Sequence, residues 1–248
     1  MLKFIDRKVL TLRASLLKYL LTLMEFKNIR GHCVYYPILN QESVVLDLGA
    51  NKGEFTNYIR NQYKSKCYAI EANEKLFHEI ESEFVQKMNV AITKEDGPIN
   101  FFLSKNNESS SLIRDFESQW GKLSEVVVEG ICWKSMLRKL ELENLVIDVL
   151  KIDIEGAELE LIENFDEGDA KLINQITVEF HDWLNRDLHV RTIKAIKKLV
   201  SYDFICLTGS PNHSWPVEAL FVRKEVLDFN FFQRMIFKLF NLFTFLKY

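Results

Sequence analysis

Val44-Val-Leu-Asp-Leu-Gly-Ala-Asn-Lys-Gly-Glu-Phe-Thr56 is the stretch that decides the fold. A short apolar, β-branched run closes on Asp47 and Gly49, and the apolar residues after Gly53 take helical spacing. This pattern predicts a strand, a tight turn and a helix. The small residues of the turn let the backbone approach a ligand, and the helix that follows offers free N–H groups. The stretch therefore predicts a nucleotide-binding turn.

An acidic residue further along the chain supports that prediction. Asn51 stands where the dinucleotide fingerprint Gly-x-Gly-x-x-Gly has its middle glycine, and asparagine tolerates a left-handed backbone. Residues 67–70 predict the next strand, which ends on Glu71. An acid at the tip of the second strand is placed to accept hydrogen bonds from both ribose hydroxyls. A plain strand–helix turn with a surface glutamate is the alternative.

Composition describes an ordinary globular chain of 248 residues, 48% hydrophobic and 27% charged, long enough for one large α/β domain. A net charge of -3 argues against a broad nucleic-acid surface. The four cysteines, Cys33, Cys67, Cys132 and Cys206, form no Cys-x-x-Cys pair, so neither a zinc cluster nor a disulfide framework is indicated. No apolar run predicts a signal peptide or a membrane span. We expect a cytoplasmic protein.

Both ends of the chain have a basic, amphipathic character. Residues 1–35 are predicted to be an N-terminal helical extension, because apolar residues recur at helical spacing over 2–26 beside a mostly basic polar face. Residues 36–224 form the central domain, and residues 225–248 form a tail in which no acid follows Asp228. Packing on the domain, self-association and peripheral contact with an anionic membrane surface all explain these ends.

A second informative stretch runs from Leu145 to Glu158. Its apolar residues predict a central strand buried on both faces, yet Lys151 and Asp153 lie two apart and hence on one side of it. An unpartnered buried charge is costly, and open α/β sheets hold ligands at the carboxyl ends of their strands, so a functional role is favoured. A structural lysine–aspartate pair is the competing explanation.

The remaining pattern alternates strands with helices and ends in a hairpin, which predicts a mostly parallel sheet with one antiparallel strand. Residues 104–124 have no clear period and predict a long loop, either a lid or acceptor wall or plain disorder. The further predicted strands are 88–92, 99–103, 125–131, 175–180, 204–208 and 217–222, and the further predicted helices are 74–86, 133–140, 157–165 and 191–200.

The motifs resemble those of the FkbM-type S-adenosylmethionine-dependent methyltransferases. The matching segments are Asp47–Gly53, Ile70–Asn73, Leu150–Glu158 and Val178–Glu179, and the resemblance covers about residues 36–223. It implies an α/β fold with the Rossmann-like, seven-stranded class I methyltransferase sheet, mostly parallel with an antiparallel last strand. It also implies methyl transfer from S-adenosyl-L-methionine to a hydroxyl of a sugar, glycolipid or small metabolite.

The resemblance also implies which residues bind the cofactor. Those expected around its methionine part are Asp47, Gly49, Asn51 and Gly53; Glu71 is expected to hold the ribose, and Asn89, Val90 and Ala91 to lie beside the adenine.

Catalysis requires a group that removes the hydroxyl proton. The candidates are Asp153, Glu179 and His181, at neighbouring strand ends. His181 has the pKa suited to a base at neutral pH, or it holds the loop. Alternatively, Asp153 and Glu179 bind a divalent cation, with His181 as a possible ligand. Lys151 is expected to orient Asp153 or to hold negative charge on the substrate.

Trp183 and Trp215 are placed to stack on a sugar face, although a core role explains either one equally well. Two other classes of function remain open. A nicotinamide-dependent oxidoreductase uses a similar first loop, but its middle glycine is missing here. A non-catalytic membrane-surface or partner-binding module would keep the fold without cofactor affinity. The sequence leaves the oligomeric state open.

Overall fold

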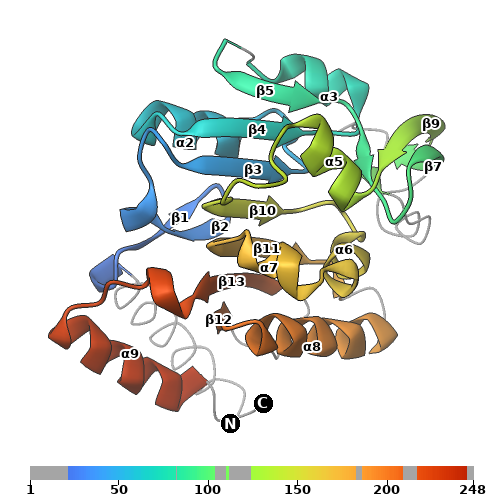
Figure 1. Cartoon of the computed structure of the whole chain (residues 1–248). Helices are drawn as coiled ribbons and strands as arrows, with labels where there is room; N and C mark the ends of the chain where they lie inside the picture. Colours follow the sequence, from blue (N-terminus) through green and yellow to red (C-terminus); the bar gives the residue numbers. More distant parts are fainter. Residues whose placement is uncertain are drawn as a thin grey trace, which may run out of the picture.

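A seven-stranded sheet forms the centre of the molecule, a computed structural model that describes residues 22–81, 83–103, 110–111, 124–182, 186–208 and 217–244. The strand order is β12-β13-β11-β10-β3-β4-β5 (Figure 1). In chain order these strands are β3 (Val44–Leu48), β4 (Lys66–Ile70), β5 (Val85–Met88), β10 (Val149–Ile152), β11 (Gln175–Phe180), β12 (Phe204–Thr208) and β13 (Val217–Arg223). Among them, β13 pairs antiparallel with both neighbours and the other pairs are parallel. The predicted mostly parallel sheet with an antiparallel last strand is confirmed.

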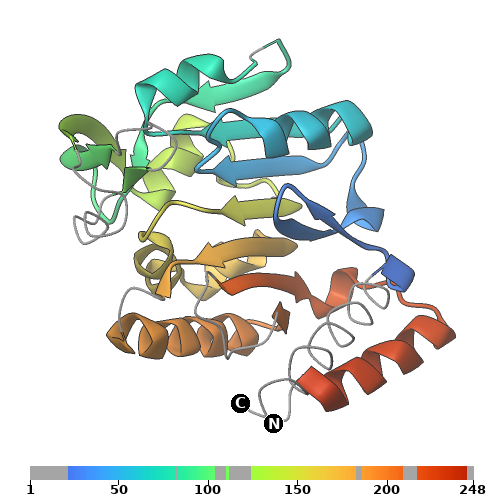
Figure 2. The ribbon, with the colours of Figure 1, turned by 180° about the vertical axis from the view of Figure 1, so that it is seen from behind.

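Helices cover both faces of this sheet (Figures 1 and 2). On one face lie α5 (Trp133–Lys139), α6 (Glu158–Asn164), α7 (Glu167–Lys171) and α8 (Arg186–Ser201), and on the other lie α2 (Glu54–Tyr63), α3 (Glu74–Glu79) and α9 (Phe231–Thr244). Every residue of β3 is buried, and its side chains alternate between the two faces: Leu46 packs on the α5–α8 side and Val45 on the α2 side. The strand was recognisable from its apolar residues for this reason, although the buried Asp47 interrupts them.

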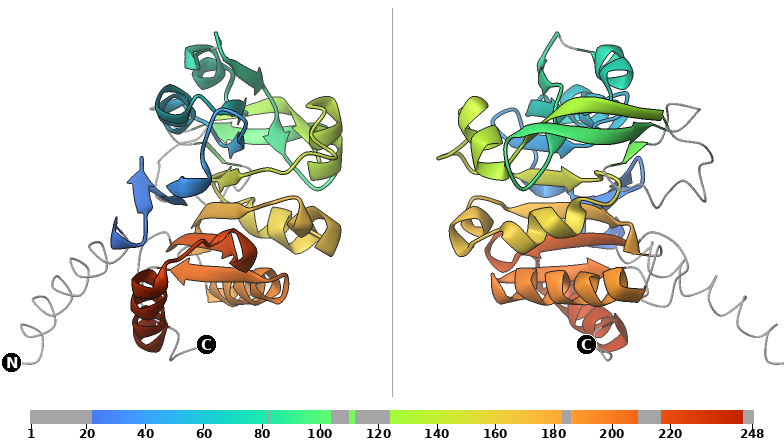
Figure 3. Two further views of the ribbon diagram at one scale, coloured as in Figure 1. Left: turned by 60° about the vertical axis from the view of Figure 1, so that its left-hand side comes forward. Right: turned by 90° about the vertical axis from the view of Figure 1, so that its right-hand side faces the viewer.

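A second, four-stranded sheet lies at the carboxyl edge of the first (Figure 3). Its order is β6-β9-β7-β8, with bounds β6 (Ala91–Ile92), β7 (Gly97–Leu103), β8 (Ser110–Ser111) and β9 (Ser124–Ile131). The long antiparallel pair of β7 and β9 runs beside the ends of the parallel strands. It therefore forms one wall over the edge where an α/β sheet binds its ligand.

The N-terminal region corrects one prediction. Residues 26–35, assigned to the helical extension, form a hairpin of β1 (Phe26–Ile29) and β2 (His32–Tyr35). Arg30 and Gly31, both with positive φ, make the tight turn, which suits a two-residue hairpin. The Gln175 side chain fixes β2 to the sheet: it accepts from the Tyr35 N–H at 2.8 Å and donates to the Tyr35 carbonyl at 3.0 Å. Of the predicted helix over 2–26, residues 2–21 lie outside the described part.

Two short 3-10 helices complete the described elements, η1 (Tyr36–Ile38) after the hairpin and η4 (Lys224–Val226) before α9.

The predicted helix 74–86 is shorter in the structure, where α3 ends at Glu79. Ile80 takes an extended backbone because its buried side chain packs against the helix start at Gly53, so the chain turns there. The predicted strand 88–92 is also wrong in its bounds. The third parallel strand is β5, and Ala91–Ile92 pairs with β9 instead.

The first two turns of the tail helix α9 combine buried and exposed side chains. Ile236 is buried with Phe229 against the hairpin, and Gln233 donates to the Leu23 carbonyl and to the Glu25 carboxylate. Phe232 and Met235 of the same helix are exposed. No helix in the described ranges is long and apolar enough to span a bilayer.

Candidate active site

The loop after β3, residues 49–53, has a backbone conformation that requires small side chains. Gly49, Asn51 and Gly53 all take positive φ, at 75°, 51° and 77°. A Cβ on Gly49 would lie 1.7 Å from the Asp153 carbonyl oxygen, so only glycine allows the loop to rest on the end of β10. The N–H groups of Gly49 and Ala50 both donate to the Ile70 carbonyl at 2.9 Å. The loop is thereby joined to the ends of both β10 and β4.

Glu71 lies at the end of β4 and faces this loop. Its Oε2 accepts from the Asn51 N–H and its Oε1 from the Asn73 N–H, each at 2.8 Å. The side chain is buried, and burial raises its pKa to about 7 in spite of the two N–H donors, which lower it. A buried carboxylate with a near-neutral pKa is suited to a ligand that donates hydrogen bonds to it.

A cavity that opens to solvent lies between the carboxyl ends of the strands and β7, and its empty space of about 560 Å³ includes part of that open solvent. It lies at the edge where open α/β sheets hold their ligands. Of the residues expected to bind cofactor, five line it: Gly49, Asn51, Glu71, Val90 and Ala91. Phe101, Asp153 and Glu155 line it as well. Phe101 was not singled out from the sequence, because its place depends on how β7 folds back over the edge.

The other three residues expected to bind the cofactor do not line the cavity but hold the backbone around it. Asn89 donates from Nδ2 to the carbonyls of Glu71 and Ala72, at 2.8 and 3.0 Å, and so fixes the end of β4. Gly53 begins α2, and a Cβ there would meet Ile80 at 3.0 Å. Asp47 is fully buried beneath the loop. These three positions shape the backbone around the cavity.

Lys151 and Asp47 form a buried ion pair under the loop. The Lys151 Nζ lies 3.0 Å from Asp47 Oδ1, donates to the Gly49 carbonyl at 2.8 Å, and lies 3.5 Å from Asp153. Thr56 donates to the other Asp47 oxygen. With its ammonium engaged on these sides and nearly inaccessible, Lys151 orients Asp153 and holds the loop, which agrees with the structural explanation left open above.

His181 is clamped between two carboxylates. Its Nδ1 lies 3.0 Å from Glu158 Oε1 and its Nε2 lies 3.0 Å from Glu155 Oε2. Burial by itself would lower the pKa of His181, but Glu158 and Glu155 outweigh it and raise the pKa to about 11. The ring is therefore protonated at neutral pH. The near-neutral pKa expected of His181 as a base is therefore wrong in this environment. The sequence analysis missed the shift because Glu155 and Glu158 come from a different stretch of the chain.

Asp153 and Glu179 have opposite electrostatic environments at neighbouring strand ends. Burial opposes ionisation of Asp153, but Lys151 and then His32 lower its pKa below the ordinary range. Burial raises the pKa of Glu179 to about 7, and the nearby charge of Asp153 adds to that effect. Both side chains were expected here, and the parallel register of β10 and β11 brings them together.

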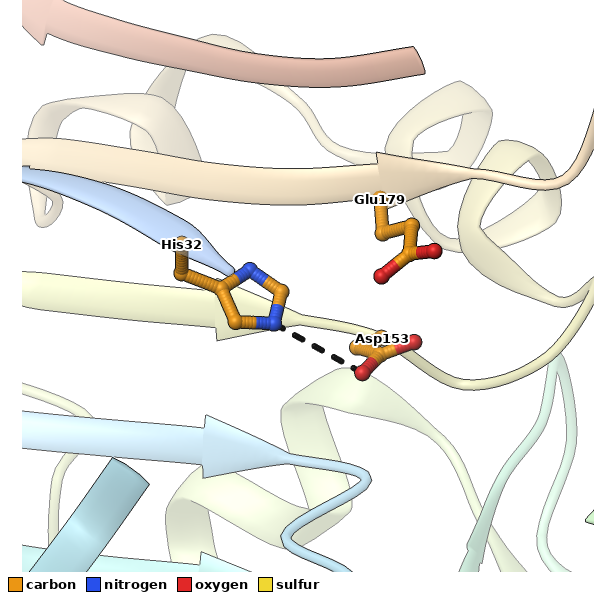
Figure 4. A group of neighbouring side chains, drawn as sticks. All are labelled: His32, Asp153 and Glu179. Carbon is orange, nitrogen blue, oxygen red and sulfur yellow. Dashed lines mark ion pairs between the residues drawn. The ribbon is translucent and has the colours of Figure 1, made fainter. Parts of the chain in front are cut away.

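His32 is the site residue that the sequence analysis missed. It extends from β2 toward the same edge, is 3% exposed, and places Nε2 3.6 Å from Asp153 Oδ2 (Figure 4). Its Nδ1 has no hydrogen-bond partner among the described residues. The position precedes every motif of the recognised pattern, so the only sequence signal was a histidine after the Arg30-Gly31 turn.

Two groups of three side chains have the spacing of a metal site. The first is His32, Asp153 and Glu179, and the second is Asp153, Glu155 and His181; within each, the ligand atoms lie within 4.8 Å of one another. Trp183 and Trp215, expected to stack on a sugar, lie outside the described residues, as does most of the predicted loop 104–124.

Comparison with known proteins gives a family match. The family model described as the Methyltransferase FkbM domain matches residues 47–206, more than half of the chain. No curated protein sequence matches the chain. Both cofactor-loop motifs and the stretch from Lys151 to His181 fall within the matched residues.

Several solved structures are similar in fold. The methyltransferase FkbM from Methylobacillus flagellatus KT is 11% identical, with a TM-score of 0.47, over 75% of this chain and 46% of that one. M. capricolum TrmK, solved with S-adenosyl-homocysteine, is 11% identical, with a TM-score of 0.40, over 75% and 65%. A precorrin-6y C5,15-methyltransferase from Geobacter metallireducens GS-15 is 13% identical, with a TM-score of 0.41, over 75% and 82%. This chain thus spans about half of the first protein and under two thirds of the second.

Proposed function

The chain belongs to the FkbM methyltransferase family, and from this premise we propose that it transfers the methyl group of S-adenosylmethionine to a hydroxyl of a sugar, glycolipid or small metabolite. The observation that carries the proposal is Glu71, a buried carboxylate at the end of β4 and in the wall of the cavity. Each of its oxygens accepts one backbone N–H and can accept a further hydrogen bond, so the pair would suit the two hydroxyls of a ribose. The loop at Gly49 and Asn51 would then adjoin the methionine part, and Val90 and Ala91 the adenine.

The chemistry needs little from the protein beyond positioning. The acceptor oxygen forms a bond to the methyl carbon, the carbon–sulfur bond breaks with its electron pair left on sulfur, and the hydroxyl proton leaves. Asp153 lines the cavity and Glu179 lies beside it at the neighbouring strand end, while His181 is held as a cation by Glu155 and Glu158. This excess of acid groups supports a hydroxyl acceptor, whose proton must be removed.

Cofactor binding is tested by calorimetric titration with S-adenosylhomocysteine. Wild type should bind saturably, and Glu71→Ala should bind about 30-fold or more weakly, since two hydrogen bonds to a charged group contribute roughly 2 kcal/mol or more. Glu74→Ala, three residues along and exposed, is the matched control and should bind like wild type. Absence of binding to wild type would refute the proposal.

The acceptor class is tested with cofactor labelled in the methyl group. Incubation with pools of glycans, glycolipids and hydroxylated metabolites should give a labelled methyl ether, which hydriodic acid converts to methyl iodide. A label that this treatment leaves in place would mark methylation of nitrogen or carbon, and the hydroxyl assignment would then be wrong.

We also propose that α9 contacts an anionic membrane surface. Three apolar side chains of this helix face outward, Phe231 at 88%, Phe232 at 55% and Met235 at 46% exposure. They lie close to Arg234, in a tail whose charges after Asp228 are all basic. Apolar side chains next to cationic ones suit the interface of an anionic bilayer.

Co-sedimentation with vesicles tests this contact. Wild type should pellet with phosphatidylserine-containing vesicles more than with pure phosphatidylcholine, and the double variant Phe231→Ser, Met235→Ser should lose that difference. Val127→Ser, an equally exposed apolar residue on β9, is the control. If wild type ignores both vesicles, α9 does not bind lipid; if it pellets but binds no cofactor, the non-catalytic module is the better explanation.

A further inference from the structure

Three side chains from three separate elements point into a common space at the carboxyl edge of the sheet (Figure 4). His32 comes from β2, Asp153 follows β10, and Glu179 belongs to β11. Each offers one ligand atom, and these atoms lie within 4.8 Å of one another. Ligands of one metal ion are separated by about 3 to 4 Å when each bond is about 2.1 Å long, so a small inward movement of the side chains completes the geometry.

The hairpin holds His32 rigidly. His32 pairs with Ile29 across the hairpin, and three residues further on Tyr35 is bound by both ends of the Gln175 side chain. The imidazole packs edge-on against Phe55 with ring centroids 5.7 Å apart. A ligand whose own orientation is fixed in this way needs little reorganisation to bind an ion.

The imidazole of His32 is also available for coordination. Its Nδ1 makes no hydrogen bond with any described residue. Its Nε2 lies 3.6 Å from Asp153 Oδ2, which is longer than an ordinary hydrogen bond. The second group lacks this property. Both ring nitrogens of His181 are already 3.0 Å from a glutamate oxygen, so an ion there would have to displace a carboxylate.

Charge favours a cation between these three residues. Glu179 pairs across the sheet with Glu218 on β13, and Asp153 and Glu155 lie close enough to repel its charge. The Lys151 ammonium lies 3.5 Å from Asp153, but the buried Asp47 balances its charge. The space between His32, Asp153 and Glu179 is therefore surrounded by more carboxylates than cations, and a divalent ion would offset this excess of negative charge.

We propose that His32, Asp153 and Glu179 bind a divalent transition-metal ion such as Mn²⁺ or Zn²⁺. One imidazole with two carboxylates suits these ions better than Mg²⁺ or Ca²⁺, which prefer oxygen ligands throughout. The consequence for catalysis rests on the proposed function: an ion here would bind the acceptor oxygen and lower the pKa of its hydroxyl, so that the proton passes to solvent at neutral pH. Asp153 and Glu179 then act as ligands rather than as bases.

The binding is tested with Mn²⁺ alone, by loss of the electron paramagnetic resonance signal of the free ion on addition of the full chain. Wild type should bind one ion per chain near neutral pH, and His32→Gln should bind at least tenfold more weakly. His78→Gln, on the exposed side of α3, is the matched control and should bind like wild type. Circular dichroism and thermal unfolding check that each variant is folded, and calorimetric titration with S-adenosylhomocysteine measures cofactor binding separately.

Three outcomes would overturn the site. Wild type leaves the Mn²⁺ signal unchanged, or His32→Gln binds as tightly as wild type, or the His78→Gln control loses affinity to the same extent. If His32→Gln does not fold, Glu179→Gln replaces it with the same expected loss. If wild type binds S-adenosylhomocysteine but not Mn²⁺, only the ion site is refuted. If it binds Mn²⁺ but not S-adenosylhomocysteine, the methyltransferase proposal is refuted and the ion site stands.

Discussion

Glu71 predicts a pH dependence of cofactor affinity. Burial raises its pKa to about 7, and the ionised carboxylate is the stronger acceptor for ribose hydroxyls. A group with a pKa of about 7 is roughly one-tenth ionised at about pH 6 and nine-tenths ionised at about pH 8, so the association constant should rise about tenfold over that range. Calorimetric titration with S-adenosylhomocysteine at several pH values measures it.

Glu71→Gln is the variant that assigns this dependence. Glutamine keeps the shape of the side chain but does not titrate, so its affinity for S-adenosylhomocysteine should be lower and nearly independent of pH between about pH 6 and about pH 8. A variant that keeps the tenfold rise would show that another group, and not Glu71, controls binding.

Lys151 predicts a large effect on stability. Lys151→Met leaves the carboxylate of Asp47 buried without its cation, which costs about 3–5 kcal/mol and should lower Tm by roughly 10 °C. Lys171→Met removes an exposed pair with Glu167 in α7 and should change stability by less than about 1 kcal/mol. Thermal unfolding of the two variants makes the comparison.

The double variant Asp47→Asn, Lys151→Met separates charge from packing. It removes the orphaned carboxylate, so it should recover part of the stability lost by Lys151→Met. If the double variant is less stable than the single one by the full cost of Asp47→Asn alone, then the two residues act independently and the ion pair is not the source of the loss.

The residues that could be predicted from sequence are those whose role is local. Gly49 and Glu71 follow strands directly, so the strand pattern alone placed them at the edge of the sheet. The charge state of His181 depends on Glu155 and Glu158, which the fold brings to it from a different loop. His32 depends on a hairpin before the motifs. Local pattern carries no information about such long-range neighbours.

At the scale of elements, Gly49 predicts how the strand–turn–helix unit fits the sheet. In Gly49→Ala the added methyl would collide with the backbone of Asp153 in a left-handed conformation, so the loop must leave the end of β10. We expect a loss of several kcal/mol and little soluble protein, in line with the cost of overpacking added to that of backbone strain. Thermal unfolding and the yield of soluble chain measure this.

Gly168→Ala is the control for that prediction. Gly168 lies on the exposed side of α7, where a Cβ meets only the Asp166 side chain at 3.0 Å and alanine favours the helix. It should change stability by less than about 1 kcal/mol. Equal stability of the two variants would show that the loop moves freely from β10, contrary to the close contact described.

Element bounds were predictable where a single periodicity holds and failed where tertiary contact decides. The strand 175–180 is confirmed because Ile176, Val178 and Phe180 alternate with polar residues, a strand period that needs no other information. The helix 74–86 fails because Ile80 is buried in the core beside Gly53, which ends the helix although Glu81 and Glu83 after it are helix-compatible. The pairing of residues 91–92 with β9 likewise depends on a strand almost forty residues away.

At the scale of the whole molecule, the chain ends complete the domain. The hairpin and α9 lie on the same face of the sheet as α2 (Figure 2). Phe26 and Tyr35 of the hairpin share a cluster with Phe229 before α9 and with Leu220 and Val222 of β13. Neither end falls within the family match at 47–206. The face of the sheet at β12 and β13 is therefore covered by residues that the family pattern does not include, so this covering could not be carried over from the resemblance.

Phe229 tests whether this packing supports the folded molecule. It is 5% exposed, and its ring centroid lies 6.3 Å from that of Phe26, 6.0 Å from Tyr35 and 5.4 Å from Phe237. Phe229→Ala should cost about 3–5 kcal/mol, as expected for removal of a core aromatic ring, and lower Tm by roughly 10 °C. Denaturant unfolding followed by fluorescence and circular dichroism gives the free energy of unfolding.

Phe232→Ala is the paired variant, because the same residue type three positions along is 55% exposed on α9. Its stability should stay within about 0.5 kcal/mol of wild type, as for surface substitutions in general. Two variants with the same small effect would mean that the chain end does not pack on the hairpin. A large loss confined to Phe229→Ala would establish that the hairpin, and with it His32, is held in place by the far end of the chain.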